Sequence, residues 1–326
     1  MIPIPLQRSN VGVGLAACGR TADGRMHSPP SNIKNGISRR DCLKTGVTLL
    51  MGAAFAQGPL ALAAGQETTH RQLRFTIALV NPKPRELQDQ TLWLYVPAAE
   101  GPTQRLAALN VSMPHQRLSD ALGQAIVKLD FLKFPPLGTK IVTLAADVLL
   151  KNEPEATLLP NPQDWLGAER FIETGDPRIQ ALAAELKQPT GRDTAQAIYA
   201  WIRQNLRYTA YAADVLGALD ALLRGGGDCT EYACLSVALA RANGIPARRV
   251  GGYVIARDSV LRPADYHDWA EVYFGGAWRL LDAQKGRWLE PAEQYVAFRY
   301  GRDQAPNPIG SAQRFRVQGE LEVRLM

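Results

Sequence analysis

Gly225-Gly226-Gly227-Asp228-Cys229 is the stretch of this 326-residue chain that says most about its fold. Three glycines allow the backbone to turn sharply. Apolar residues then recur at helical spacing until Gly244 and Pro246, which predict the end of a helix. The pattern therefore predicts a tight turn that leads into a helix, with Cys229 in its first turn.

This position favours a reactive thiol at Cys229. The first N–H groups of a helix are unpaired and lie at the positive end of its macrodipole. We therefore expect the pKa of the thiol to fall below about 8.5, and the same N–H groups to stabilise an oxyanion. A small buried hydrophobic residue is the alternative. Cys234 lies about 140° further round the helix, which predicts a packing role for it and no disulfide with Cys229.

A base for this thiol is predicted on a β-hairpin. Two predicted strands flank Gly275-Gly276, which is typical of a two-residue turn. Pairing Phe274 with Ala277 puts His267 and Asp282 on the same face, on diagonal positions about 7–8 Å apart. The carboxylate would fix the tautomer of the imidazole and leave its other nitrogen for the thiol. A one-residue slip in register would break this arrangement. Alternatively, His267 is an ordinary surface histidine and Asp282 is a turn residue at the end of its strand.

Several segments in order resemble bacterial transglutaminase-like proteins. The resemblance spans roughly residues 195–290 and implies a papain-like fold, in which a nucleophile helix packs on an antiparallel sheet. It implies the triad Cys229, His267 and Asp282 and acyl transfer from an amide. The segments are Gly227–Ala233, Leu239–Arg248, Val250–Tyr253, His267–Tyr273 and Trp278–Asp282.

Three more residues match motifs of that family. Trp269 and Glu271 share the face of His267 by strand parity, and we expect them to support the hairpin rather than to react. Tyr208 resembles an upstream family tyrosine that completes the oxyanion site. A buried aromatic residue in the core is an equally weighted interpretation of Tyr208.

The predicted fold class is α+β. Short alternating strands punctuated by proline and glycine predict an N-terminal β-sandwich over residues 70–152. The papain-like or transglutaminase-like catalytic domain is expected over residues 160–300, where Asp193 is the expected cap of its first helix. Residues 301–326 form a C-terminal extension whose alternation indicates an edge strand.

Residues 1–66 are interpreted as a leader. Ser38-Arg39-Arg40-Asp41-Cys42-Leu43-Lys44 resembles a twin-arginine export motif, although Cys42 stands where an aromatic residue is usual. An apolar run and a small-x-small site near Ala63 follow. This pattern predicts a periplasmic or otherwise exported protein, with no stable membrane span after cleavage. An anchoring N-terminal helix is the alternative.

Charge and motif spacing exclude several function classes. The formal net charge is +6, but residues 1–63 hold seven Lys/Arg and two acidic residues, which leaves 30 basic against 29 acidic residues in the remainder. Nucleic-acid binding therefore has no electrostatic support. The four histidines are not spaced as metal ligands and there is no CxxC. We expect no metal and no cofactor, and the calcium dependence of animal relatives is not carried over.

The sequence thus predicts an exported, cysteine-dependent amide-bond hydrolase that acts through a thioester. The expected substrate is a peptide or protein, a cell-wall peptide being one candidate; the oligomeric state stays open. Two alternatives remain: a protein-glutamine transamidase, and a binding module that keeps the fold without catalysis. Substrate contacts are expected from residues 214–221 and 257–266, and the second segment is the expected lid because it precedes His267.

Overall fold

Two largely antiparallel sheets face each other, formed mainly by the N-terminal strands of the described chain and completed by strands from its C-terminal part. The computed structural model describes residues 68–211, 214–289, 292–303, 305–310 and 314–326, and the predicted leader lies outside them. One sheet has the order β10-β1-β6-β3, with β16 also paired to β1, and the other has the order β15-β2-β5-β4. The strands are β1 (Thr68–Val80), β2 (Leu87–Tyr95), β3 (Gln104–Val111), β4 (Gln116–Ser119), β5 (Ala125–Phe134), β6 (Thr139–Lys151), β10 (Ser259–Val260), β15 (Phe315–Gln318) and β16 (Glu322–Leu325).

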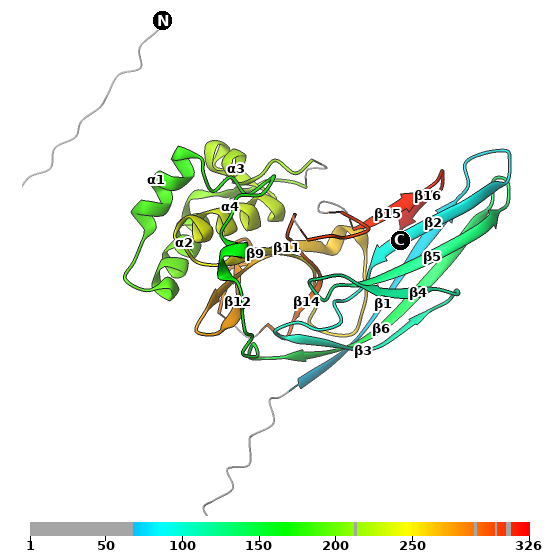
Figure 1. Ribbon diagram of the computed structural model, residues 1–326, viewed down its shortest axis with the longest axis horizontal. Coiled ribbons are helices and arrows are strands. Elements are labelled where there is room, and N and C mark those ends of the chain that lie inside the picture. Colours follow the sequence, from blue (N-terminus) through cyan, green and yellow to red (C-terminus); the bar gives the residue numbers. More distant parts are fainter. Residues whose placement is uncertain (1–67, 212–213, 290–291, 304, 311–313) are drawn as a thin grey trace, which may run out of the picture. The chain divides into compact units, whose positions relative to one another are not determined.

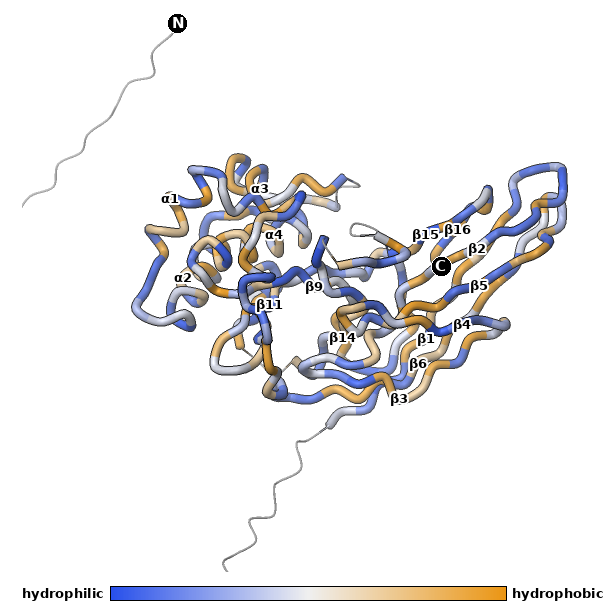
Figure 2. Tube along the Cα trace, in the orientation of Figure 1, coloured by the Kyte–Doolittle hydropathy of each residue, from blue (hydrophilic) through white to orange (hydrophobic). Residues whose placement is uncertain are grey.

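Alternating side chains explain why these strands pack as a sandwich. Apolar and polar residues alternate along β1, β5 and β6, and Figure 2 shows the corresponding changes of hydropathy along the strands. The inward residues Leu73, Ile77, Leu129 and Leu144 are almost fully buried. The core between the sheets is therefore built from one face of each strand.

The remaining described part combines helices with a third antiparallel sheet, so that the described chain is α+β, as the sequence predicts. The sheet has the order β13-β12-β11-β9-β14, and Figure 1 shows α1 to α4 gathered on one side of it. The elements are η1 (Pro162–Trp165), α1 (Pro177–Leu186), α2 (Gly191–Asn205), β7 (Arg207–Tyr208), α3 (Ala218–Arg224), β8 (Gly226–Gly227), α4 (Cys229–Ala242), β9 (Ala247–Val254), η2 (Pro263–Asp265), β11 (Tyr266–Phe274), β12 (Ala277–Asp282), β13 (Arg287–Trp288) and β14 (Tyr295–Tyr300).

The cap predicted for the helix that became α2 was wrong by about one turn. Helix α2 starts at Gly191, and the Thr190 hydroxyl accepts a hydrogen bond from the Asp193 backbone N–H. Asp193 therefore lies inside the first turn, where its charge favours the positive end of the helix. Thr190 is the earlier of two residues able to cap, and the helix uses it.

The hairpin has the predicted register. Phe274 lies opposite Ala277 and the pairing continues to Ala270 opposite Leu281. Gly275 and Gly276 have φ angles of 60° and 76°, the left-handed values that a type I′ turn needs at both central positions.

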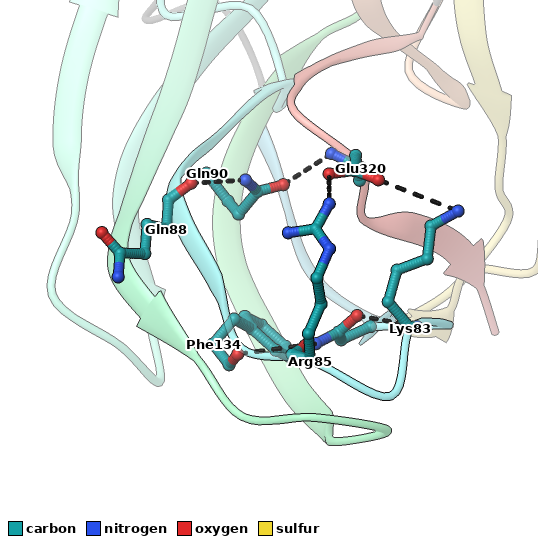
Figure 3. A network of polar contacts seen from close by, with 7 residues as sticks. Lys83, Arg85, Gln88, Gln90, Phe134 and Glu320 are labelled. Atoms are coloured by element: carbon teal, nitrogen blue, oxygen red, sulfur yellow. Dashed lines mark hydrogen bonds and ion pairs between the residues drawn. The ribbon is translucent and has the colours of Figure 1, made fainter.

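The C-terminal residues complete the sandwich with two strands. β15 extends the second sheet along β2, and β16 pairs with β1. Between them Glu320 forms ion pairs with Lys83 and Arg85, and its backbone N–H donates to the Gln90 side chain (Figure 3). The end of the chain is thus tied to the β1–β2 connection.

The segment 257–266, expected to be a lid, is tied to the sandwich instead. Ser259 and Val260 pair in parallel with β1. The Leu261 backbone N–H donates to the Arg74 carbonyl oxygen, and Asp258 accepts from the Gln72 backbone N–H. Since both sides of the loop are anchored, it forms a fixed wall in this structure. Leu261 also joins the sandwich core, together with side chains from β9 and β14.

The described residues hold no helix that is both long and apolar enough to cross a membrane.

Candidate active site

Cys229 is the first residue of α4, as the sequence predicts. The preceding glycines do more than turn the chain, because β8 pairs in parallel with β7. A Cβ on Gly226 would lie 2.7 Å from the Arg207 carbonyl oxygen, and one on Gly227 would lie 2.3 Å from the Glu231 Cβ. Glycine is therefore needed for the close approach of two chain segments that fixes where Cys229 begins its helix.

A capping box holds the start of α4. The Asp228 carboxylate accepts from the Thr230 backbone N–H at 2.7 Å, and the Glu231 carboxylate accepts from the Asp228 backbone N–H at 3.1 Å. Both acidic residues are buried. Two of the N–H groups expected to stabilise negative charge on Cys229 are thus already paired with carboxylates.

The expected low pKa of Cys229 was wrong. Burial, together with the charges of Asp268 and Asp228, raises the pKa of its thiol to about 12. The reason is local: a helix end contributes only a partial positive charge, whereas two carboxylates and an apolar environment oppose the thiolate. In this state Cys229 rests as a thiol and depends on a base to lose its proton.

His267 and Asp282 are joined as the hairpin register implies. The His267 Nε2 atom lies 2.7 Å from the Asp282 Oδ2 atom, and both residues are buried. Burial acts to raise the pKa of Asp282, but the hydrogen bond and charge of His267 outweigh it and hold that pKa below its ordinary value of 3.8. Asp282 is therefore the ionised partner, and Nδ1 is the ring nitrogen left for the thiol.

Tyr295 and Trp269 hold this pair in place. The Tyr295 hydroxyl donates to Asp282 Oδ2 at 2.8 Å. The Trp269 ring stacks on the His267 ring with centroids 6.2 Å apart, and packs edge-on against Tyr295 at 5.1 Å. Trp269 is buried, so it supports the histidine as expected and offers no reactive group.

The backbone brings the sulfur of Cys229 against the histidine strand. The N–H of Asp268, the residue that follows His267, donates to the Cys229 sulfur and acts to lower its pKa. The Thr230 hydroxyl donates to the Asp268 carboxylate at 3.0 Å, which fastens α4 to β11 beside the sulfur. Cys229 and His267 line one cavity of about 810 Å³, within the size range of ligand sites.

Tyr208 is at the site and not in the core. Its side chain is 57% exposed and lines the same cavity as Cys229. Burial, then the charges of Cys229 and Asp228, raise the pKa of its hydroxyl, so it remains a hydrogen-bond donor at neutral pH. The interpretation as a buried core aromatic was therefore wrong.

Glu271 lies further along β11 and pairs with Arg248. The Arg248 Nε and Nη2 atoms are 2.8 and 2.6 Å from the Glu271 Oε2 atom. The guanidinium lies over the rings of Trp278 and Tyr300, at 4.3 and 3.9 Å from their centroids. Glu271 thus has a supporting position, as expected from the sequence.

Cys234 is fully buried, and the Arg249 guanidinium donates to its sulfur at 3.7 Å. This agrees with the packing role expected for it. Both Cys229 and Cys234 are free thiols.

Two residues that touch the site, Tyr295 and Asp268, had no predicted role. Asp268 follows His267, and only the contact between α4 and β11 reveals which residues Asp268 faces. Tyr295 reaches Asp282 because β14 pairs with β9, a pairing that the order of residues along the chain does not reveal. Tyr295 lies on a strand with other aromatic residues, and nothing in the sequence set it apart from them.

The described residues contain no group of three or more His, Cys, Asp or Glu side chains arranged to hold a metal ion.

Comparisons with known proteins match part of the chain to one family. Residues 180–283 match the model of the family described as Transglutaminase-like superfamily. A stretch of 132 residues, 39% of this chain, is 31% identical to "Uncharacterized protein ML0607" of Mycobacterium leprae (strain TN) and covers 46% of that protein, so the match spans about half of its length.

A solved structure with a TM-score above 0.5 has the same fold. A crystal structure from Cytophaga hutchinsonii, named "Putative Cysteine Protease", is superposable with a TM-score of 0.56 at 22% identity, over 80% of this chain and 92% of that one. The periplasmic domain of TgpA from Pseudomonas aeruginosa matches 66% of this chain and 90% of its own at 18% identity, with a TM-score of 0.36. The stretch that matches the transglutaminase-like superfamily model, residues 180–283, contains Cys229, His267 and Asp282.

Proposed function

We propose that this protein is a cysteine-dependent acyl-transfer enzyme that hydrolyses amide bonds in peptides or proteins. The observation that carries the proposal is the buried His267–Asp282 pair, with the Cys229 sulfur against the same strand and in the same cavity. A histidine oriented by a carboxylate next to a thiol is the arrangement that nucleophilic cysteine catalysis needs.

The raised pKa of Cys229 decides how the reaction starts. A resting thiolate–imidazolium pair is disfavoured, so His267 acts as a general base and takes the proton as the sulfur attacks the amide carbonyl. Asp282 stabilises the imidazolium that forms. The same proton then passes to the leaving amine, which leaves a thioester on Cys229.

The oxyanion of the tetrahedral intermediate needs donors near the sulfur. The Tyr208 hydroxyl, exposed in the cavity and protonated at neutral pH, is our candidate for one of them. Water then attacks the thioester with His267 as its base, which releases the acid. Hydrolysis is favoured over transfer to an amine because Arg257, Asp258 and Lys285 line the cavity, and such polar side chains admit water.

The experiment is to trap the thioester. The protein is incubated with a mixed peptide digest, quenched in acid and analysed by mass spectrometry for an adduct on Cys229 that hydroxylamine removes. We expect the adduct in the natural protein and none in Cys229→Ser. Adding a labelled amine separates the alternatives: label on glutamine side chains would mean transamidation, and no adduct under any condition would mean a binding module.

We also propose that the protein is exported, on the twin-arginine-type sequence around Arg39 and Arg40. The expected mature protein begins near Ala63. Sequencing the N-terminus of the protein recovered from the periplasm tests this, with Arg39→Lys/Arg40→Lys as the matched variant. A full-length chain retained in the cytoplasm would contradict export.

A further inference from the structure

A second cavity, of about 430 Å³, adjoins the nucleophile. Its lining includes Cys229 and Tyr208 but not His267. Three arginines line it as well: Arg249, Arg299 and Arg314. The proposed reaction gives none of these arginines a role.

Two of these arginines are buried side by side. Arg249 lies on β9 and Arg299 on β14, and Arg299 pairs with Gly251, two residues along β9 from Arg249. Each side chain belongs to a residue that is only 8% exposed. Burial, and then the neighbouring charge of Arg249, lower the pKa of Arg299. Burial acts to lower the pKa of Arg249 as well, but neighbouring groups that include Asp268 outweigh it and raise that pKa.

Their known partners do not balance two buried charges. The Arg249 guanidinium donates to the weak acceptor sulfur of Cys234, and Arg299 contacts the Tyr95 hydroxyl. Among the described residues, the ion pairs within 4.0 Å include none with either of these arginines. Asp268 is the carboxylate whose charge acts on both, and it is shared with the Thr230 hydroxyl.

Arg314 adds a third cation at the edge of this cavity. It is half-buried, lies over the Tyr266 ring at 4.6 Å and donates to the Pro263 carbonyl oxygen at 3.1 Å. Buried cations are costly unless an anion is paired with them, and guanidiniums bind carboxylates through paired, charge-assisted hydrogen bonds. Three guanidiniums and two carboxylates, those of Asp228 and Asp268, line this cavity next to the nucleophile, and the excess of one positive charge fits a negatively charged substrate group.

The position of His267 says which part of the substrate carries that group. His267 must give its proton to the leaving amine, so the amine side of the substrate lies in the cavity that His267 lines. The acyl side then extends from Cys229 into the other cavity. We propose that Arg249, Arg299 and Arg314 bind a carboxylate on the acyl donor, so that the enzyme selects acidic acyl groups; this rests on the acyl-transfer function proposed above.

The test compares two alkylating agents that differ in charge. Iodoacetate and iodoacetamide both react by displacement of iodide by the Cys229 sulfur, and both need the thiolate. The ratio of the iodoacetate rate to the iodoacetamide rate is therefore independent of the thiol pKa. At one fixed pH we expect this ratio to be about tenfold higher for Cys229 than for 2-mercaptoethanol, as one charge-assisted contact would give. It should fall about tenfold in Arg299→Gln and in Arg249→Gln, and less in half-buried Arg314→Gln.

Controls keep this test independent of folding and of the proposed function. Mass spectrometry resolves Cys229 from buried Cys234, and labelling of Cys234 reports unfolding of a variant. Arg178→Gln removes an exposed arginine on α1 that pairs with Asp176 and should keep the natural ratio. A ratio equal to that of the small thiol, or unchanged in the folded Arg314→Gln and Arg299→Gln proteins, would overturn the proposal. His267→Ala tests the acyl-transfer function separately. This variant should slow acylation of Cys229 but leave the ratio of the two alkylation rates unchanged.

A second measurement tests the acyl side. Thiophenyl esters of glutaric acid and of its monoamide present the same chain with a carboxylate or an amide. We expect the acid to acylate Cys229 about tenfold faster, and Arg299→Gln to remove this preference. Equal rates for the two esters in the natural protein would refute an acidic acyl donor.

Discussion

Replacing Asp282 by Asn removes the negative charge beside His267 while it keeps the size of the side chain. Asp282 accepts from His267 Nε2 at 2.7 Å, from the Tyr295 hydroxyl at 2.8 Å and from the Lys285 backbone N–H at 3.0 Å. Asp282 is 2% exposed, so water can do little to compensate for the loss of its charge. The charge matters because His267 becomes an imidazolium only while it holds the proton of Cys229.

The size of the effect follows from Coulomb's law. For unit charges about 4 Å apart at an effective dielectric constant of about 20, the interaction is ~4 kcal/mol. Losing it from the transition state slows acylation by about a thousandfold, since ~1.4 kcal/mol corresponds to a factor of ten. A rearranged amide that still bonds to His267 would recover part of this, so we expect a loss between about 100-fold and 1000-fold.

The assay is single-turnover acylation of Cys229 by a thiophenyl ester, followed by release of thiophenol. Asp220→Asn is the matched control: this carboxylate pairs with Arg224 on α3 and does not touch His267. Thermal unfolding shows whether each variant is folded. If folded Asp282→Asn keeps its rate within about threefold of the natural protein, the carboxylate does not stabilise the imidazolium and the reasoning fails.

Three further predictions concern neighbouring residues. Asp268→Asn removes a charge that raises the pKa of Cys229, so that pKa should fall by about one unit; alkylation by iodoacetamide at pH 8, below the pKa of the natural thiol, should then speed up, and an unchanged rate would count against this cause. Tyr208→Phe should slow acylation about 10-fold to 1000-fold by loss of one oxyanion donor with little change in alkylation; equal acylation rates would remove Tyr208 from the site. Glu271→Ala leaves Arg248 buried without its carboxylate and should lower the free energy of unfolding by about 3–5 kcal/mol, measured by urea denaturation; a loss below about 1 kcal/mol would mean that the aromatic rings alone hold the guanidinium.

The hairpin and the nucleophile helix could be predicted because their signals are local. Gly275 and Gly276 adopt the positive φ angles of a two-residue turn, and this fixes the register that brings His267 and Asp282 together. The cap at Asp228 likewise fixes where α4 begins. In both cases a few adjacent residues determine the geometry.

Features that depend on distant contacts could not be predicted. The pKa of Cys229, on helix α4, depends on burial and on the charge of Asp268, which lies 39 residues away on strand β11. Helices α1 and α3 were not predicted; α3 is short, and its N-cap Gly217 makes no side-chain cap bond. The lid over residues 257–266 was predicted because this segment precedes His267. Its pairing with β1 could not be predicted, because the two segments lie almost 190 residues apart in the chain.

The most direct measurement of the central claim is the pH dependence of Cys229 acylation in the natural protein and in His267→Ala. A proton must pass from the sulfur to the imidazole, so the natural rate should rise with pH as the base loses its own proton. His267→Ala should lose that rise and acylate at least about 100-fold more slowly at pH 7. The same pH profile and a similar rate in the folded variant would contradict the claim that His267 is the base for Cys229.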